Sequence, residues 1–191
     1  MGAVIWKDTR QHHGKHAVKE EWWESHGVPT VLKKLDFGDY QIDGSNVSVD
    51  TKQGLAEIAG NLSREHNRFR REVERANDAG FLLVVLVETN EAECLEDVRK
   101  WCNTHCLKCT YRHGGLCNPR DDGVCQRHGT KHPVQGEMLA KQMKTMESRY
   151  SVRFEFVRPE NSAKRICELL GVKHDTKAES DTDDVSRNRV P

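Results

Sequence analysis

The hydrophobic residues of this chain are concentrated in one unbroken run at residues 81–87, FLLVVLV. The run follows Gly80, precedes the polar segment TNEAE and is rich in Leu and Val. Such a run is typical of a strand that is buried on both faces of a sheet, in the middle of an α/β layer. Shorter segments with the pattern of strands are found at residues 3–8, 30–37 and 152–157.

Helical patterns lie between these strands. Residues 136–150 carry one apolar stripe at helical spacing, made of Leu139, Met143, Met146 and Tyr150. Further helical patterns cover residues 16–27, residues 55–80 in about two segments, and residues 161–172. Strands that alternate with helices predict an α/β fold. A hairpin pattern at residues 35–54 makes the central sheet mixed rather than purely parallel, with helices flanking it.

The length of 191 residues suits one domain. Residues 101–132 change character, because they hold most of the cysteines and show little periodicity. We interpret them as an insertion. From residue 174 onward the chain is polar and lacks a core face, which predicts a disordered tail. The expected organisation is a domain at 1–173 that contains the insertion, followed by a tail at 174–191.

The hairpin has a turn at DGSN, residues 43–46. A two-residue or a four-residue loop gives one register, in which Tyr40 faces Val49 and Asp39 faces Asp50. A three-residue loop would break it. Side chains alternate along a strand, so one face carries Tyr40, Ile42, Val47 and Val49 toward the core. The other face carries Asp39, Gln41, Ser48, Asp50 and Lys52.

Two carboxylates at facing positions repel each other, and one of them would be driven to keep its proton. A divalent cation reverses the sign of that interaction. Oxygen ligands of this kind suit Mg²⁺ or Mn²⁺. Lys52 beside Asp39 and Asp50 could orient a water molecule or stabilise charge on a phosphate, which are the components of metal-assisted phosphodiester hydrolysis. The alternative is an ordinary solvated face of a hairpin.

Three short motifs resemble a known family. Gly38-Asp39 followed by Asp50-Thr51-Lys52 is similar to the PD-(D/E)XK nuclease superfamily, and more narrowly to the XPF-type structure-specific endonuclease domain. An early Asp8-Thr9-Arg10 element also resembles that domain. The chain departs from the family pattern at Thr51, where an Arg is usual. It departs again at Ala56, where the last acid would stand and Glu57 follows one residue late.

The resemblance implies a restriction-endonuclease-like fold and a role for each matching residue. Asp39 and Asp50 would bind Mg²⁺ or Mn²⁺, Lys52 would position the attacking water or the scissile phosphate, and Asp8 would assist at the edge of the site. Arg10 would contact DNA. The implied activity is cleavage of branched or junction DNA in repair or recombination, by a homodimer. The alternative is a non-catalytic DNA-binding scaffold with a nuclease-like fold and a structural zinc.

A basic stripe precedes the apolar run. Arg64, Arg68 and Arg71 recur at helical spacing, and Arg75 extends the stripe. Guanidinium groups on one helix face can follow a phosphate backbone. We therefore expect Arg64, Arg68 and Arg71 to bind DNA, the alternative being a surface helix with internal salt bridges.

The insertion carries a candidate zinc site. Cys106-x-x-Cys109 has the spacing of half a tetrahedral site. Cys117 and Cys125 are the preferred second half. Cys102, His105, His113 and His128 are the competing ligands. The alternative is a loop of reduced thiols without metal, and the remaining Cys94 and Cys167 are expected in the core.

Charge and hydropathy limit the partners. Lys plus Arg and Asp plus Glu both number 30, which excludes a simple polycation but not a local basic face. The apolar run is far shorter than the roughly 20 residues that span a bilayer. The first residues lack the pattern of an export signal. We therefore expect a cytoplasmic protein without a membrane partner, in which the 7 cysteines stay reduced.

Overall fold

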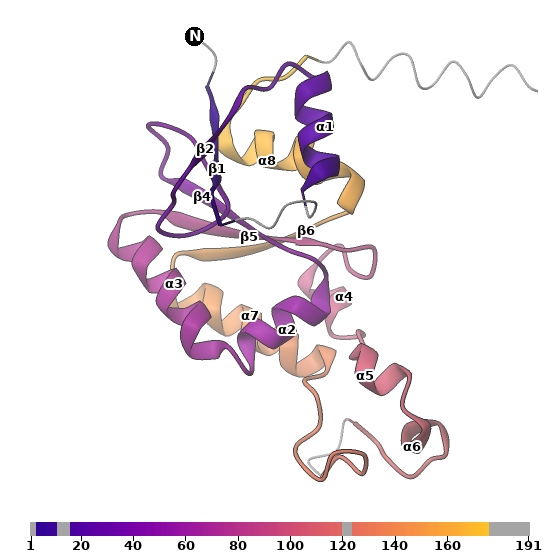
Figure 1. The fold of residues 1–191 in the computed structure, drawn as a ribbon. Coiled ribbons are helices and arrows are strands. Elements are labelled where there is room, and N and C mark those ends of the chain that lie inside the picture. The colour runs from indigo at the N-terminus through magenta and orange to yellow at the C-terminus, as the bar shows by residue number, and fades with distance from the viewer. Residues whose placement is uncertain (1–2, 11–15, 120–123, 176–191) are drawn as a thin grey trace, which may run out of the picture.

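The computed structural model describes residues 3–10, 16–119 and 124–175, and in these ranges the chain forms a mixed sheet flanked by helices on both faces (Figure 1). The sheet has six strands in the order β2-β1-β3-β4-β5-β6. Strand β3 is antiparallel to its neighbours β1 and β4, and the other pairs are parallel. The strands are β1 Ile5–Asp8, β2 Thr30–Lys33, β3 Tyr40–Gln41, β4 Val47–Lys52, β5 Leu82–Glu88 and β6 Val152–Val157. The prediction of an α/β fold with a mixed sheet is confirmed.

The predicted register of the hairpin is also confirmed, since Tyr40 pairs with Val49. Strand β5 lies between β4 and β6 and alternates between two cores. Leu83, Val85 and Val87 belong to one hydrophobic cluster, and Val84 and Leu86 belong to the other. Because helices cover both faces, Leu83 to Val87 are buried on both sides, as the pattern predicted, whereas Leu82 at the start of the run is half-buried.

Two helix layers enclose the sheet. Helices α1 (Ala17–Ser25) and α8 (Ser162–Leu170) cover one face. Helices α2 (Leu55–Leu62), α3 (His66–Asp78) and α7 (Gly136–Arg149) cover the other (Figure 1). A short 3-10 helix, Pro159–Asn161, leads into α8. Trp23 Nε1 donates a hydrogen bond to the Ala163 carbonyl at 3.2 Å and so joins the two helices of the first layer.

A cysteine-rich insertion, residues 102–135, projects from the second layer (Figure 1). The short helices α4 (Leu95–Val98), α5 (Thr104–Leu107) and α6 (Thr110–His113) lie before and within it. Its two ends meet where Gly136 N donates to the Trp101 carbonyl at 3.0 Å. A Cβ on Gly136 would lie 2.1 Å from the Val98 carbonyl oxygen, so only glycine fits this contact. The insertion therefore ends at residue 135, slightly later in the chain than the predicted end at residue 132.

The predicted tail begins inside the fold. Asp175 N donates to the His26 carbonyl at 3.2 Å, and the ring of His174 packs on Trp22. Residues 176–191, where the rest of the predicted tail falls, lie outside the described residues. Across the described ranges, no helix is long and apolar enough to cross a membrane.

Candidate active site

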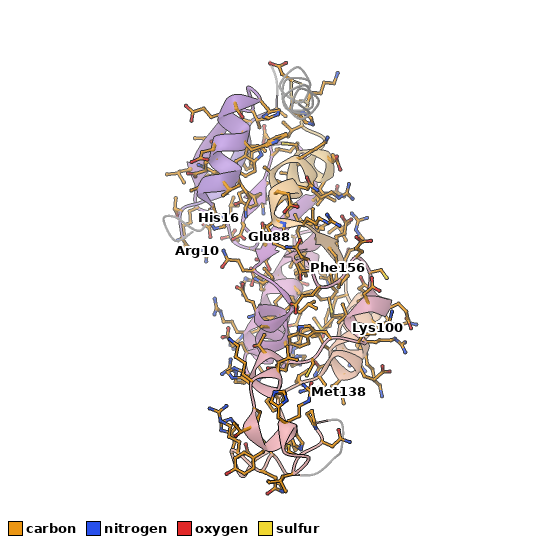
Figure 2. The ribbon with its side chains drawn as sticks, turned by 90° about the vertical axis from the view of Figure 1, so that its right-hand side faces the viewer. Arg10, His16, Glu88, Lys100, Met138 and Phe156 are labelled. Carbon is orange, nitrogen blue, oxygen red and sulfur yellow. The ribbon has the colours of Figure 1, made fainter. Side chains whose placement is uncertain are left out.

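A polar cleft of about 500 Å³ opens where β1, the hairpin, β4 and α3 converge. It is lined by all but one of the residues proposed for catalysis or DNA contact, the exception being Arg64. Those that line it are Asp8, Arg10, Asp39, Asp50, Lys52, Arg68 and Arg71. Arg10, His16 and Glu88 lie near one another at its edge (Figure 2). The fold thus brings together side chains from four separate parts of the sequence.

Asp50 and Lys52 form a buried ion pair in this cleft. They lie two residues apart on β4, so both side chains project from the same face. Lys52 Nζ is 2.6 Å from Asp50 Oδ2, and the two side chains are 12% and 5% exposed. Burial raises the pKa of Asp50 to about 7 against the lowering effect of Lys52, and the charges of Asp39 and Glu72 add to the increase. Burial lowers the pKa of Lys52, but the Asp50 carboxylate more than reverses this, so the ammonium form is favoured.

One oxygen of this pair lies among several charges. Asp50 Oδ2 is fully buried and lies 2.6 Å from the Lys52 ammonium. The negative charges of Asp39 and Glu72 also act on the Asp50 carboxyl. A carboxylate beside other acids fits a hard cation that prefers carboxylate oxygens.

Asp39 is held in place by the residue that departs from the family pattern. Thr51 N and Thr51 Oγ1 both donate to Asp39 Oδ2, at 2.9 and 2.5 Å. Gly38 allows the close approach, because a Cβ there would lie 2.3 Å from Ser48 Oγ and its φ is +66°. The hairpin therefore fixes the Asp39 carboxylate beside Asp50.

Asp8 lies at the cleft, as expected, and both of its carboxylate oxygens are engaged. Its Oδ2 accepts from Arg10 Nε at 2.7 Å, and its Oδ1 accepts from Leu35 N at 3.2 Å. Arg10 also donates to the Leu35 carbonyl. Asp8 therefore positions Arg10 at the cleft, and its assistance to metal or water stays a prediction.

The basic stripe is shifted along the chain. Helix α3 begins at His66 with Glu65 as its N-cap, so Arg64 lies in the turn before it. The expectation that Arg64 starts the helical stripe is wrong, and its guanidinium lies near Gly60 instead of the cleft. Arg68, Arg71 and Arg75 form the stripe that lines the cleft.

Several acids that line the cleft were not predicted as site residues, among them Glu72 and Glu88. Glu72 lies among the arginines of α3, where it seemed only to dilute their charge, and its Oε1 accepts from Gly38 N at 3.2 Å. In the sequence, the only feature that pointed to Glu72 was its position four residues after Arg68, which places both residues on one face of the helix. Glu88 accepts contacts from the buried Lys19 Nζ and from Ser162 Oγ, which join α1 and α8 to the end of β5. Glu57, the late acid of the motif, accepts from Gln53 N at 2.7 Å.

The candidate zinc ligands Cys106, Cys109, Cys117 and Cys125 line a second, small cavity, together with His105 and His128. Burial raises the pKa of the Cys106 thiol, which also feels the sulfur atoms of Cys102, Cys125 and Cys109. His132 was missed: its Nδ1 lies 3.8 Å from Cys117 Sγ. Among the remaining cysteines, burial raises the pKa of Cys167 to about 11. Cys94 is exposed, so the expectation of a core position is wrong for it.

In neither cavity do the described residues already form a group of three or more His, Cys, Asp or Glu side chains that could hold a metal ion. In sequence comparisons, no protein-family model and no curated protein matches the chain.

Proposed function

We propose that the protein is a metal-dependent DNA nuclease that hydrolyses phosphodiester bonds in the cleft. One observation carries the proposal: the buried Asp50–Lys52 pair lies beside Asp39 in a cleft that arginines line. The sequence motifs at these same residues resemble the PD-(D/E)XK superfamily and its XPF-type branch, whose restriction-endonuclease-like fold we propose for this sheet. That resemblance also supports branched or junction DNA as the substrate and a homodimer as the active form.

Each residue of the cleft would have a separate role in this reaction. Asp50, which is buried beside Lys52, and Asp39, oriented by Thr51, would hold Mg²⁺ or Mn²⁺. Such an ion, when bound, activates water and neutralises charge on the phosphate. Lys52 would donate to the attacking water or to a phosphate oxygen, since it stays protonated beside Asp50. Arg10, Arg68 and Arg71 would bind the flanking phosphates.

The test is a cleavage assay on branched and linear DNA with Mg²⁺, with Mn²⁺ and with chelator. We expect metal-dependent cleavage by the wild type. Asp50→Asn should lower the rate by about 100-fold or more, because it removes a ligand charge. Asp43→Asn is the matched control, since Asp43 is an exposed acid in the turn of the same hairpin. It should cleave as the wild type does.

The second candidate is a DNA-binding scaffold without catalysis. It is favoured by the lack, within the described ranges, of three side chains already arranged to hold a metal. The two candidates differ in one outcome. A wild type that binds branched DNA tightly but does not cut it with either metal would reject the nuclease and support the scaffold.

A further inference from the structure

The cysteine-rich insertion buries cysteines and exposes its large apolar side chains, whereas an ordinary fold buries the apolar side chains. Its buried side chains include Cys106, Cys109 and Cys125, at 6%, 5% and 4% exposure. Its large apolar side chains are exposed instead, at Leu107, Tyr111, Leu116 and Val124. Neither hydrophobic cluster includes a residue between Trp101 and Val134. Hydrophobic packing therefore does not hold this segment together, and another cross-link is needed.

Two tight backbone loops present the thiols. In the first, Cys109 N donates to the Cys106 carbonyl at 3.3 Å. In the second, Cys125 N donates to the Thr130 carbonyl at 2.7 Å, and Gly129 N returns to the Cys125 carbonyl at 2.8 Å. A bridge between Val124 and Lys131 closes this second loop. Cysteines of both loops line one small cavity, and closely spaced cysteines of this kind are typical ligands of a tetrahedral zinc site.

The cavity between these loops has the size of a single ion site. It measures about 10 Å³, close to the room that one water molecule needs. Cys106, Cys109, Cys117 and Cys125 all line it, so sulfur can reach its centre from several sides. All the described cysteines are free thiols rather than disulfides.

Of the competing ligands that the sequence offered, Cys102 and His113 are engaged elsewhere and His105 and His128 are exposed, whereas His132 is half-buried beside Cys117. Cys102 Sγ accepts from Arg112 Nη1 at 2.8 Å and lines a different cavity. His113 Nε2 is 2.7 Å from the Leu107 carbonyl oxygen. His128 lines the cavity but is exposed, whereas Cys117 is half-buried.

We propose that Cys106, Cys109, Cys117 and Cys125 bind one structural Zn²⁺ ion that holds the insertion together. Gln135 connects this site to the body of the protein. Its Nε2 donates to Cys106 Sγ at 3.3 Å, and its Oε1 accepts from Asn103 N at 3.2 Å. Hydrogen bonds to ligating atoms orient a metal site. The thiols close around the ion as it binds, because zinc binding and local folding are coupled in such sites.

The proposal is tested on the full chain expressed with added zinc. Elemental analysis should give about one zinc per chain. Serine replacements at Cys106, Cys109, Cys117 and Cys125 should each lower that content by at least about half, because each removes one of four ligands. Cys102→Ser and Cys94→Ser are the matched controls and should keep the zinc. Wild-type protein with almost no zinc would overturn the proposal.

A second measurement covers variants that fold poorly. Cobalt replaces zinc in the wild type, and its thiolate charge-transfer absorption reports sulfur ligands directly. We expect this band, and we expect Asp50→Asn to retain it, so the result is independent of the proposed nuclease activity. Cobalt binding without the thiolate band would overturn the assignment. Zinc kept by Cys117→Ser but lost by Cys102→Ser would do so as well.

Discussion

At the scale of single residues, the hairpin holds several charged side chains that are largely buried. The Asp50–Lys52 pair is buried, and Asp39 and Glu72 add negative charge around it. A buried ion pair is only weakly stabilising, because desolvation offsets the attraction between the charges. The pair therefore contributes little to the stability of the fold, which is consistent with the metal site that we propose there.

The raised pKa of Asp50 gives stability an unusual dependence on pH. Its value moves from 3.8 to about 7 in the folded protein. Between these values the folded state binds more protons than the unfolded state, so the free energy of unfolding falls as the pH rises. In chelator, Asp50 by itself should lower the free energy of unfolding of the wild type by a few kcal/mol between about pH 4 and pH 7, and Asp50→Asn should lack this contribution. Urea unfolding across this range measures both slopes, and equal slopes would contradict the prediction.

Thr51 should act on the site through Asp39 alone. Thr51→Val keeps the shape and the backbone N–H but removes the hydroxyl that donates to Asp39 Oδ2. We expect Mg²⁺ affinity to fall by roughly 10-fold to 100-fold, as is usual when a hydrogen bond to a ligand is lost. Calorimetric titration of Mg²⁺ checks this. Thr51→Ser restores the hydroxyl and should recover most of the affinity, and a serine variant as weak as the valine variant would count against the role.

At the scale of elements, helix α3 supplies the basic wall of the cleft. The turn that ends at Glu65 interrupts the helical pattern. Arg64 therefore does not lie on the helix face that carries Arg68, Arg71 and Arg75. The remaining arginine of the helix lies outside the cleft, because Arg70 Nε pairs with Glu74 Oε1 at 3.4 Å and Arg70 lines another groove. Helix α3 thus presents one group of arginines to the cleft and another arginine away from it.

This division predicts different salt dependence for two neighbouring arginines. Arg71→Ala should weaken DNA binding and reduce the slope of log affinity against log salt by about 1, because one phosphate contact is lost. Arg70→Ala, on the same helix but outside the cleft, should leave the slope unchanged. Titrations by fluorescence anisotropy at several salt concentrations compare them. If both variants changed the slope equally, the cleft would not be the DNA site.

At the scale of the whole molecule, the fold has two parts with different sources of stability. The sheet and its helix layers are held by two hydrophobic clusters. The cysteine-rich insertion contributes no buried residue to either, and its ends are joined at Trp101 and Gly136. The two ends of the insertion already lie together, so a short linker is long enough to join them. The insertion can therefore in principle be removed without disturbing the rest of the fold.

Replacing residues 104–132 by a short Gly/Ser linker should therefore leave a folded domain. We expect cooperative urea unfolding and a change in the free energy of unfolding within about 1 kcal/mol, apart from the loop-length term. Leu139→Ala in α7 provides the scale, because Leu139 is 0% exposed and its truncation should be destabilising by about 2–5 kcal/mol. Loss of cooperative unfolding in the linker variant would mean that the insertion supports the core.

The sequence by itself determined the elements and the local geometry of the site. The run at residues 81–87 predicted a strand that is buried on both faces, and that is how β5 lies. The alternation of side chains in the hairpin predicted that Tyr40 pairs with Val49, which the structure confirms, and that Asp39, Asp50 and Lys52 share a face. These predictions succeeded because a strand repeats every two residues and a turn fixes register locally.

Only the tertiary structure decided which distant groups join them. Arg10 is held by Asp8, Glu72 approaches through Gly38, and Gly136 closes the base of the insertion. Their places depend on how β1, α3 and α7 pack against the sheet, and no periodicity in the chain encodes that packing. Local pattern sets which way a side chain points, whereas long-range packing sets what it meets.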